Sequence, residues 1–263
     1  MIVRAATLLF VILVSVAVTS FTIDATDTLT GSPATLLAQL WSPSVCEEGM
    51  VVVAVGAGSI CVDVYEASAA AGCDVGVPSA LQGTVNNLAN PDCVPRSVAG
   101  AEPWTFVTYA QARQLCSRAG KRLPTPREWY EAALGTPDTA TTCQINGERV
   151  RTGVLPDCRS GAGVSDMIGN VWEYVSNDGL EIVPSSGYVA DIDTAGLPVA
   201  VRAEPQLAFN NDYVWTKEMT SEPIMVRGGF YGGGEDAGLF AVQATLSGEF
   251  SSAAIGFRCV KDL

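Results

Sequence analysis

Eight cysteines and a complete absence of histidine constrain the fold of this 263-residue chain more than any other feature. Zinc sites usually need Cys-x-x-Cys pairs or histidines, and neither is present. An even set of cysteines therefore favours disulfides. The sequence does not fix the pairing, but we predict Cys143 with Cys158 first, because that pair closes a short loop. The full set is Cys46, Cys61, Cys73, Cys93, Cys116, Cys143, Cys158 and Cys259.

The N-terminus has the pattern of a secretory signal. Arg4 precedes about fourteen uncharged residues (5–18), and small residues follow. A membrane span needs roughly 20 apolar residues, so this run is short for one. We expect residues 1–20 to be a cleaved signal peptide, with a retained membrane anchor as the alternative. The protein is then secreted, periplasmic or held at the cell surface, where disulfides form.

Composition limits the partners and the number of domains. The net charge of −13 repels nucleic-acid phosphates and anionic lipids, so we expect no nucleic-acid ligand, and membrane contact only through an uncleaved N-terminus. Residues 21–45 carry no strong periodicity and are interpreted as a linker or N-terminal arm. Residues 46–263 are long enough for one domain with a sizeable core.

Local patterns predict an α+β, loop-rich fold. Apolar runs at 51–55 and 60–65 indicate two strands, and 72–96 indicates a surface loop stapled by cysteines. Two capping boxes, starting at Thr108 and Thr125, each precede a helical pattern. Beyond Pro137 only short strands and loops are expected. The predicted fold therefore has two helices, short antiparallel strands and disulfide staples.

Five motifs occur along most of the chain in a fixed order. They are CVDVYEAS at 61–68, GKRLPTPREW at 120–129, GVSDMIGNVWEY at 163–174, RGG at 227–229 and GFRC at 256–259. Together they resemble the formylglycine-generating enzyme family, also called sulfatase-modifying factor domains, which is a branch of the C-type lectin fold. The resemblance implies that fold. Trp104, Trp129 and Trp172 are expected in its core.

The same resemblance implies that the chemistry of the family has been lost. Those enzymes oxidise a cysteine of a target peptide with two copper-binding cysteines, four and nine residues beyond the second glycine of the Arg-Gly-Gly motif. The matching positions here are Gly233 and Gly238, and neither can bind copper. A second branch, the sulfoxide synthases, holds iron with histidines, which this chain lacks. We therefore expect neither copper nor iron, and no catalytic residues.

A structural calcium site is the cofactor that the resemblance implies. Its ligands would be the side chains of Asp166 and Glu173 and the backbone carbonyls of Gly169 and Val171, since hard oxygen donors suit calcium. The alternative is that these polar groups hydrogen-bond the surrounding loops without a metal. Other acids that lie close in sequence, such as Asp63 with Glu66, are interpreted as structural or solvated rather than catalytic.

The C-terminal segment is the expected recognition surface. Rigid aromatics interleaved with small residues favour ligand binding. Phe240 is expected to be buried instead. The predicted ligand-binding residues are Phe230, Tyr231, Glu235, Asp236, Thr245, Leu246, Phe250 and Ser252.

This segment also resembles the variable proteins of diversity-generating retroelements, which keep the fold and are rewritten at adenines, mostly in Asn codons. Such rewriting can give Phe, Tyr, Gly, Ser, Thr, Ala or Leu but never Gln or Glu, so Gln243 and Glu249 would be fixed positions. We therefore predict an exported, non-catalytic protein that binds a protein or glycan ligand. The alternatives are a divergent oxidase of protein cysteine and a structural component of the cell surface.

Overall fold

The computed structural model describes residues 46–176, 180–183, 188–191, 212, 214–215 and 224–263. The predicted signal peptide and arm, residues 1–45, lie outside this part. Cys46–Leu263 forms one compact unit. Within the described residues, no helix has the length and apolarity to cross a membrane.

The unit is α+β, as predicted. Its helices are α3 (Leu81–Ala89), α4 (Tyr109–Arg118) and α5 (Pro126–Ala133), with a short 3-10 helix η2 (Gly234–Asp236). The strands are β1 (Met50–Val55), β2 (Gly58–Asp63), β3 (Ser68–Ala69), β4 (Pro95–Arg96), β5 (Trp172–Val175), β6 (Leu180–Val183), β7 (Tyr188–Asp191), β8 (Val214–Trp215), β9 (Ile224–Arg227), β10 (Val242–Leu246), β11 (Ile255–Gly256) and β12 (Val260–Asp262).

Both predicted capping boxes are confirmed. The Thr108 hydroxyl accepts from the backbone N–H of Gln111, whose side chain accepts in return from the N–H of Thr108. Thr125 and Glu128 form the same reciprocal pair at the start of α5. Each box satisfies two of the backbone donors that a helix start leaves without partners.

The prediction of two helices was incomplete, because α3 forms inside the predicted stapled loop. Its start has no side-chain cap. Tertiary contacts hold it instead: the Asn87 side chain hydrogen-bonds both backbone groups of Val75, and the Thr84 hydroxyl accepts from the indole N–H of Trp104. Arg118 of α4 donates to the carbonyls of Leu88 and Asn90, which lie at the C-terminal end of α3. Local signals were therefore too weak to predict this helix.

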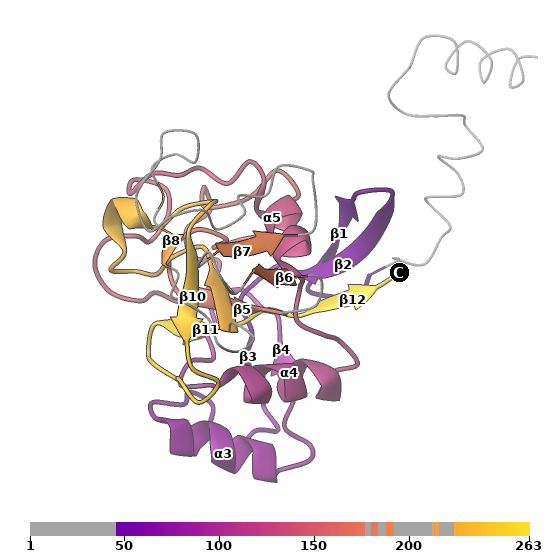
Figure 1. Cartoon of the computed structure of the whole chain (residues 1–263). Helices are drawn as coiled ribbons and strands as arrows, with labels where there is room; N and C mark the ends of the chain where they lie inside the picture. The colour runs from indigo at the N-terminus through magenta and orange to yellow at the C-terminus, as the bar shows by residue number, and fades with distance from the viewer. Residues whose placement is uncertain (1–45, 177–179, 184–187, 192–211, 213, 216–223) are drawn as a thin grey trace, which may run out of the picture. The chain divides into compact units, whose positions relative to one another are not determined.

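Two main sheets frame the unit. β1, β2 and β12 form an antiparallel sheet, and β11, β5, β9, β10 and β8 form the second. The expectation of antiparallel strands was wrong for two pairs, since β11 runs parallel to β5 and β10 parallel to β8. Figure 1 shows α3 and α4 together at one end and α5 beside β1.

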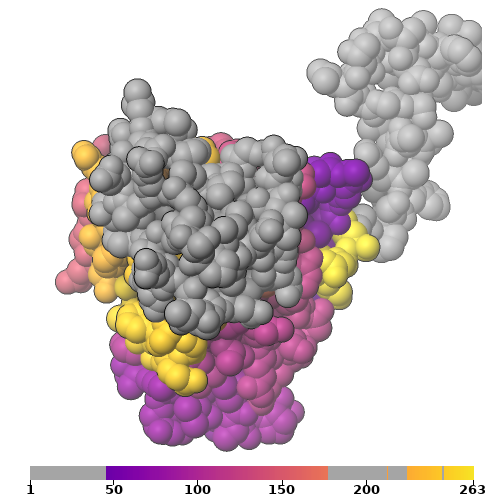
Figure 2. Space-filling view, in the orientation of Figure 1, coloured from indigo at the N-terminus to yellow at the C-terminus, as the bar shows by residue number. Residues whose placement is uncertain are grey.

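Two hydrophobic clusters make up most of the core. One joins α5, through Trp129, to strands of both sheets, including Val62 of β2 and Val242 of β10. The other packs α4, through Leu115, against Trp172 and Phe257. Trp104, Trp129 and Trp172 are all buried, as predicted. In the space-filling view, the yellow C-terminal segment is exposed beside the purple and magenta helical layer (Figure 2).

All eight cysteines are paired in four disulfides, and none is free. Cys143–Cys158 is confirmed, and Cys73–Cys93 staples the segment that contains α3. Cys46–Cys61 ties the start of the unit to β2, and Cys116–Cys259 ties α4 to the closing motif.

Candidate functional site

The Arg-Gly-Gly motif ends β9 in a turn that has no room for side chains. Gly228 and Gly229 have φ of +92° and +86°, which L-residues rarely adopt. A Cβ on Gly228 would lie 2.6 Å from the carbonyl oxygen of Met167, and one on Gly229 would lie 2.2 Å from the Cβ of Ala237. Both glycines are therefore required by packing, and they direct the chain into the turn that begins at Phe230.

The two positions that correspond to the family's copper cysteines follow in this turn. Gly233 precedes η2, and a Cβ there would lie 3.1 Å from the Cβ of Ala237. A Cβ on Gly238 would lie 2.2 to 2.3 Å from the carboxyl atoms of Asp212. The carboxyl group of Asp212 thus fills the space beside position 238. It accepts a 2.7 Å hydrogen bond from the backbone N–H of Phe240.

The predicted recognition residues divide between two turns. Phe230 and Tyr231 are half-buried and pack edge to face, with ring centroids 5.3 Å apart, while Glu235 and Asp236 are exposed on η2. Phe250 is 42% exposed. Leu246 and Ser252 are half-buried, and the side chain of Thr245 lies outside the described part.

The segment 170–172 brings the two turns together. The carbonyl of Asn170 accepts from the N–H of Tyr231, and the N–H of Trp172 donates to the carbonyl of Ala254. Two residues of chain span at most about 7 Å, so the two turns are held close together on this segment. The backbone of the second turn is held further by Phe106, whose N–H donates to the carbonyl of Ser252.

Phe240 is half-buried rather than buried, so that expectation was wrong. Its ring packs against that of Tyr130 with centroids 5.7 Å apart. The helix α5 therefore covers only part of this side chain.

The polar groups of the predicted calcium site are engaged by the protein itself. Glu173 is buried, and its carboxylate accepts from Arg258 at 2.5 and 2.7 Å and from the indole N–H of Trp129 at 2.7 Å. One oxygen of Asp166 accepts from the N–H of Gly153 and the hydroxyl of Thr152, whereas the other is buried without a hydrogen bond.

This arrangement fits the predicted calcium ligation poorly. The guanidinium of Arg258 already supplies the cation that Glu173 needs, and calcium would have to displace it. Gly169 packs against the carbonyl of Gln144, and Val171 is buried. Among the described residues, no three acidic, cysteine or histidine side chains are grouped for a metal. The family resemblance implies calcium here, whereas the contacts of Glu173 favour the alternative in which these groups hold the loops without a metal.

The sequence did not indicate that Arg258 and Glu66 join Glu173 and Asp166 in one ionic cluster. Arg258 belongs to the closing GFRC motif, and Glu66 to the opening CVDVYEAS motif. Glu66 accepts from the Asn170 side chain at 2.7 Å and from the N–H of Val171. Burial, and then the charges of Asp166 and Glu173, raise the pKa of Glu66 well above its usual value. The interpretation of Asp63 and Glu66 as structural is supported, since Asp63 pairs with Lys121 at 2.7 Å.

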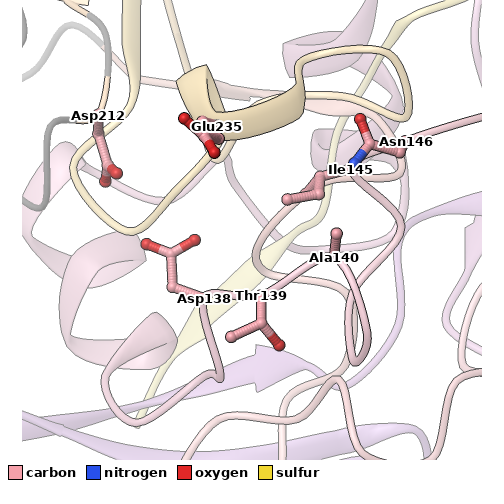
Figure 3. A pocket seen from close by; sticks show the side chains of 7 residues that line it. All are labelled: Asp138, Thr139, Ala140, Ile145, Asn146, Asp212 and Glu235. Atoms are coloured by element: carbon pink, nitrogen blue, oxygen red, sulfur yellow. The ribbon is translucent and has the colours of Figure 1, made fainter.

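A pocket of about 680 Å³ lies beneath η2. Its lining comes from the loop after α5, from the segment before β8 and from η2 itself (Figure 3). Among the described residues that line it, three are acidic and none is basic. The described lining residues are Asp138, Thr139, Ala140, Ile145, Asn146, Asp212 and Glu235. Glu235 is the one predicted recognition residue among them.

The chain is similar to curated proteins over part of its length. The chain is similar to the hercynine oxygenase of Mycolicibacterium thermoresistibile, with 32% identity over 93 residues, 29% of this chain and 21% of that protein. It is also similar to that of Mycobacterium tuberculosis, with 28% identity over 129 residues, 43% of this chain and 28% of that protein. The chain thus spans less than a third of the length of these relatives. No family model matches.

Solved structures with a similar chain path include the P3c variant of the Major Tropism Determinant, with 20% identity, 84% of this chain and 54% of that chain covered, and a TM-score of 0.47. PvdO from Pseudomonas aeruginosa has 16% identity, 78% and 81% coverage, and a TM-score of 0.47. Hercynine oxygenase is an enzyme of the formylglycine-generating type, so the resemblance to that group is confirmed.

Proposed function

We propose that this protein is an exported, non-catalytic binding protein that presents a recognition surface on a scaffold like that of the formylglycine-generating enzymes. The surface consists of the two turns 230–236 and 246–254, which we call the recognition turns. One observation carries the proposal. The positions of the copper cysteines are Gly233 and Gly238, and every cysteine of the chain is consumed in a disulfide. No cysteine thiolate is therefore left to bind copper.

The recognition turns have the properties of a binding surface. They expose Phe250 and part of the Phe230–Tyr231 pair, and large aromatic side chains lose little conformational entropy on binding. Backbone hydrogen bonds to the 170–172 segment hold both turns before a ligand arrives. Such pre-organisation lowers the ordering cost of association.

Export is supported by the disulfides. Four of them join elements across the whole compact unit, as is typical of proteins that fold in an oxidising compartment. The N-terminal pattern of a signal peptide agrees with this location, and mass spectrometry of the mature N-terminus would locate the cleavage.

Diversification of the recognition turns is a further part of the proposal. Gln243, which rewriting of Asn codons cannot produce, lies in β10 opposite Val226, where the ladder fixes the backbone. The permitted products Phe230, Tyr231 and Phe250 lie in the turns on either side. Sequencing of the gene and its flanks across isolates would show variation confined to the turns and a neighbouring reverse transcriptase. A uniform segment without such a neighbour would reduce the proposal to a fixed recognition domain.

Selection from a random peptide library displayed on phage, together with a glycan array, tests the binding function. We expect enriched ligands whose affinity falls at least tenfold when Tyr231→Ala and Phe250→Ala are combined. Val77→Ala is the matched control, because Val77 is also an exposed apolar side chain but belongs to the segment around α3. Ligands that bind both variants equally, or no enrichment at all, would refute recognition by these turns.

The alternative of a cysteine oxidase has a direct test. The protein is incubated with copper and a Cys-x-Pro-x-Arg peptide, and the peptide mass is followed for conversion of cysteine to formylglycine. Conversion would overturn the proposal. Stoichiometric co-purification with envelope proteins, insensitive to changes in the recognition turns, would favour the second alternative, a structural component of the cell surface.

A further inference from the structure

We propose that the open edge of β1 pairs with β1 of a second copy of this chain, antiparallel and centred on Val53. The pairing joins two three-stranded sheets into one continuous sheet. The inference goes beyond the proposed function, because β1 belongs to the other sheet and contributes no residue to the recognition turns.

The hydrogen bonds of the sheet show which backbone groups of β1 point outward. In a ladder, the backbone groups of successive residues point to opposite neighbours. The N–H of Asp63 donates to the carbonyl of Cys259, on the side of β12. Val62 is therefore directed at β1, and Val51, its partner in the register, is directed back at it. The next residue of β1, Val52, points its N–H and C=O away from β2.

Val52 and Ala54 form the open edge of β1. β2 lies between β1 and β12, so β1 stands at one end of the sheet (Figure 1). Val52 is 44% exposed, and Ala54 is exposed as well. Among the described residues, β1 pairs with no strand other than β2, and the outward groups of Val52 and Ala54 have no hydrogen-bond partner. Such an edge is a template for another strand.

The sequence of β1 has none of the features that usually protect an edge strand. Its six residues, MVVVAV, include no charge and no proline. On one face, Val51, Val53 and Val55 pack into the core cluster that contains Trp129 of α5. On the other face the side chains are also apolar. Both faces therefore favour a neighbouring strand over water.

Antiparallel self-pairing centred on Val53 satisfies the open edge. Val52 of each copy lies opposite Ala54 of the other, and each such pair exchanges both of its N–H···O=C bonds. Val53 meets its own copy at the twofold axis. Val51 lies opposite Val55 of the second copy, so the half-buried valines at the margin of the core gain an apolar neighbour.

Charges at the two ends of β1 favour the same partner. Glu48 is exposed just before the strand. Just beyond its end, the guanidinium of Arg127 lies 3.1 Å from where a Cβ on Gly56 would lie. In the antiparallel pair, Glu48 of one copy lies two residues, or about 7 Å, along the strand from Gly56 of the other. The carboxylate is thus placed near Arg127 of the second copy, which complements its charge.

The opposite edge of the sheet is closed. Arg122 and Val260 of β12 exchange both backbone hydrogen bonds, at 2.9 and 2.8 Å. Of the two edges of this sheet, β1 is therefore the one that offers its backbone to another chain. Pairing about a twofold axis then stops at a dimer and does not continue into a fibre.

Sedimentation equilibrium of the mature protein at increasing concentration tests the inference. We expect a reversible monomer–dimer equilibrium, and slower hydrogen exchange at the amides of Val52 and Ala54 as the dimer forms. Val52→Lys should raise the dissociation constant of the dimer at least tenfold, because an edge lysine opposes strand pairing. Val77→Lys is the matched control, since Val77 is 47% exposed but lies in the segment around α3.

Two further variants test the register. Ala54→Pro removes an outward N–H and leaves the ladder to β2 intact, so it should weaken the dimer as Val52→Lys does. Glu48→Lys should also weaken it, and adding Arg127→Glu should restore it. Asp92→Lys changes the charge equally at an exposed site away from β1 and should have a smaller effect. Melting curves of each variant show that it folds.

Three results would overturn the inference. The first is a monomer at every concentration in which the amides of Val52 and Ala54 exchange rapidly. The second is a monomer in which these amides are always protected, because residues of the same chain then cover the edge. The third is a dimer that neither Val52→Lys nor Ala54→Pro weakens. Ligand binding that depends on Tyr231 and Phe250 is measured separately, so each result leaves the proposed function standing.

Discussion

The carboxylate of Glu173, expected to hold calcium, forms a buried two-point ion pair with the guanidinium of Arg258. Arg258 also donates to the backbone carbonyls of Asp63 and Ser165. One side chain of the closing motif thus joins the end of β2, the loop at Ser165 and the start of β5.

Arg258→Met should therefore destabilise the protein by about 3–5 kcal/mol, because it leaves Glu173 buried without a partner. Chemical denaturation of the oxidised protein measures the change. Arg151→Met is the control: Arg151 is exposed and pairs with Glu102 at the surface, where an ion pair contributes no more than about 1 kcal/mol. Similar losses in the two variants would contradict the structural role of Arg258.

The ion pair of Glu173 with Arg258 leads us to predict that calcium does not bind to Glu173. Since Arg258 and Trp129 occupy the oxygens of Glu173, millimolar calcium should leave the melting temperature unchanged relative to EDTA. Calorimetry should detect no binding heat at the same concentrations. A rise of several degrees with calcium, accompanied by measurable heat, would establish the site that the family resemblance implies.

Gly238 and Asp212 should be energetically coupled. Gly238→Ala places a Cβ within 2.3 Å of the Asp212 carboxyl group, and such overpacking costs about 1–3 kcal/mol. In an Asp212→Ala background the space is free, so the same change should cost much less. Gly248→Ala, whose Cβ would meet nothing within 4 Å, is the control. Additive effects of the two changes would show that Asp212 does not fill this space.

The raised pKa of Asp212 predicts how stability depends on pH. Its ordinary value is 3.8, and the folded protein holds the proton up to about pH 7. Between these values the unfolded chain releases the proton first, so this group lowers stability as pH rises from about 4 to 7.

Asp212→Asn, which keeps an acceptor for the Phe240 N–H, should remove this dependence. The variant should be stabilised relative to wild type at pH 8 and not at pH 4, by up to a few kcal/mol since each pKa unit is about 1.4 kcal/mol. Denaturation curves at both pH values measure this. An equal difference at pH 4 and pH 8 would contradict a raised pKa.

Whether a feature could be predicted from the sequence depends on how far apart in the chain its residues lie. The capping boxes of Thr108 and Thr125 and the Cys143–Cys158 pair depend on residues close in the chain, and all three were predictable. The ion pair of Glu173 with Arg258 joins residues 85 positions apart, and the Gly238–Asp212 contact joins residues 26 apart. No local pattern encodes such contacts, and the pocket needs three segments at once.

The disulfides also differ in the sequence separation of their cysteines, and we expect their removal to have unequal effects on stability. Cys116–Cys259 closes a loop of 143 residues, whereas Cys143–Cys158 closes one of 15. In the chain-entropy description, these loops stabilise the fold by about 5 and about 3 kcal/mol. Replacing the long-range pair by alanines should therefore lower the unfolding free energy by about 2 kcal/mol more than replacing the short-range pair. Both pairs are buried, so cavity costs are similar in kind. Equal losses would show that compact structure in the unfolded chain, rather than loop length, governs the contribution of Cys116–Cys259.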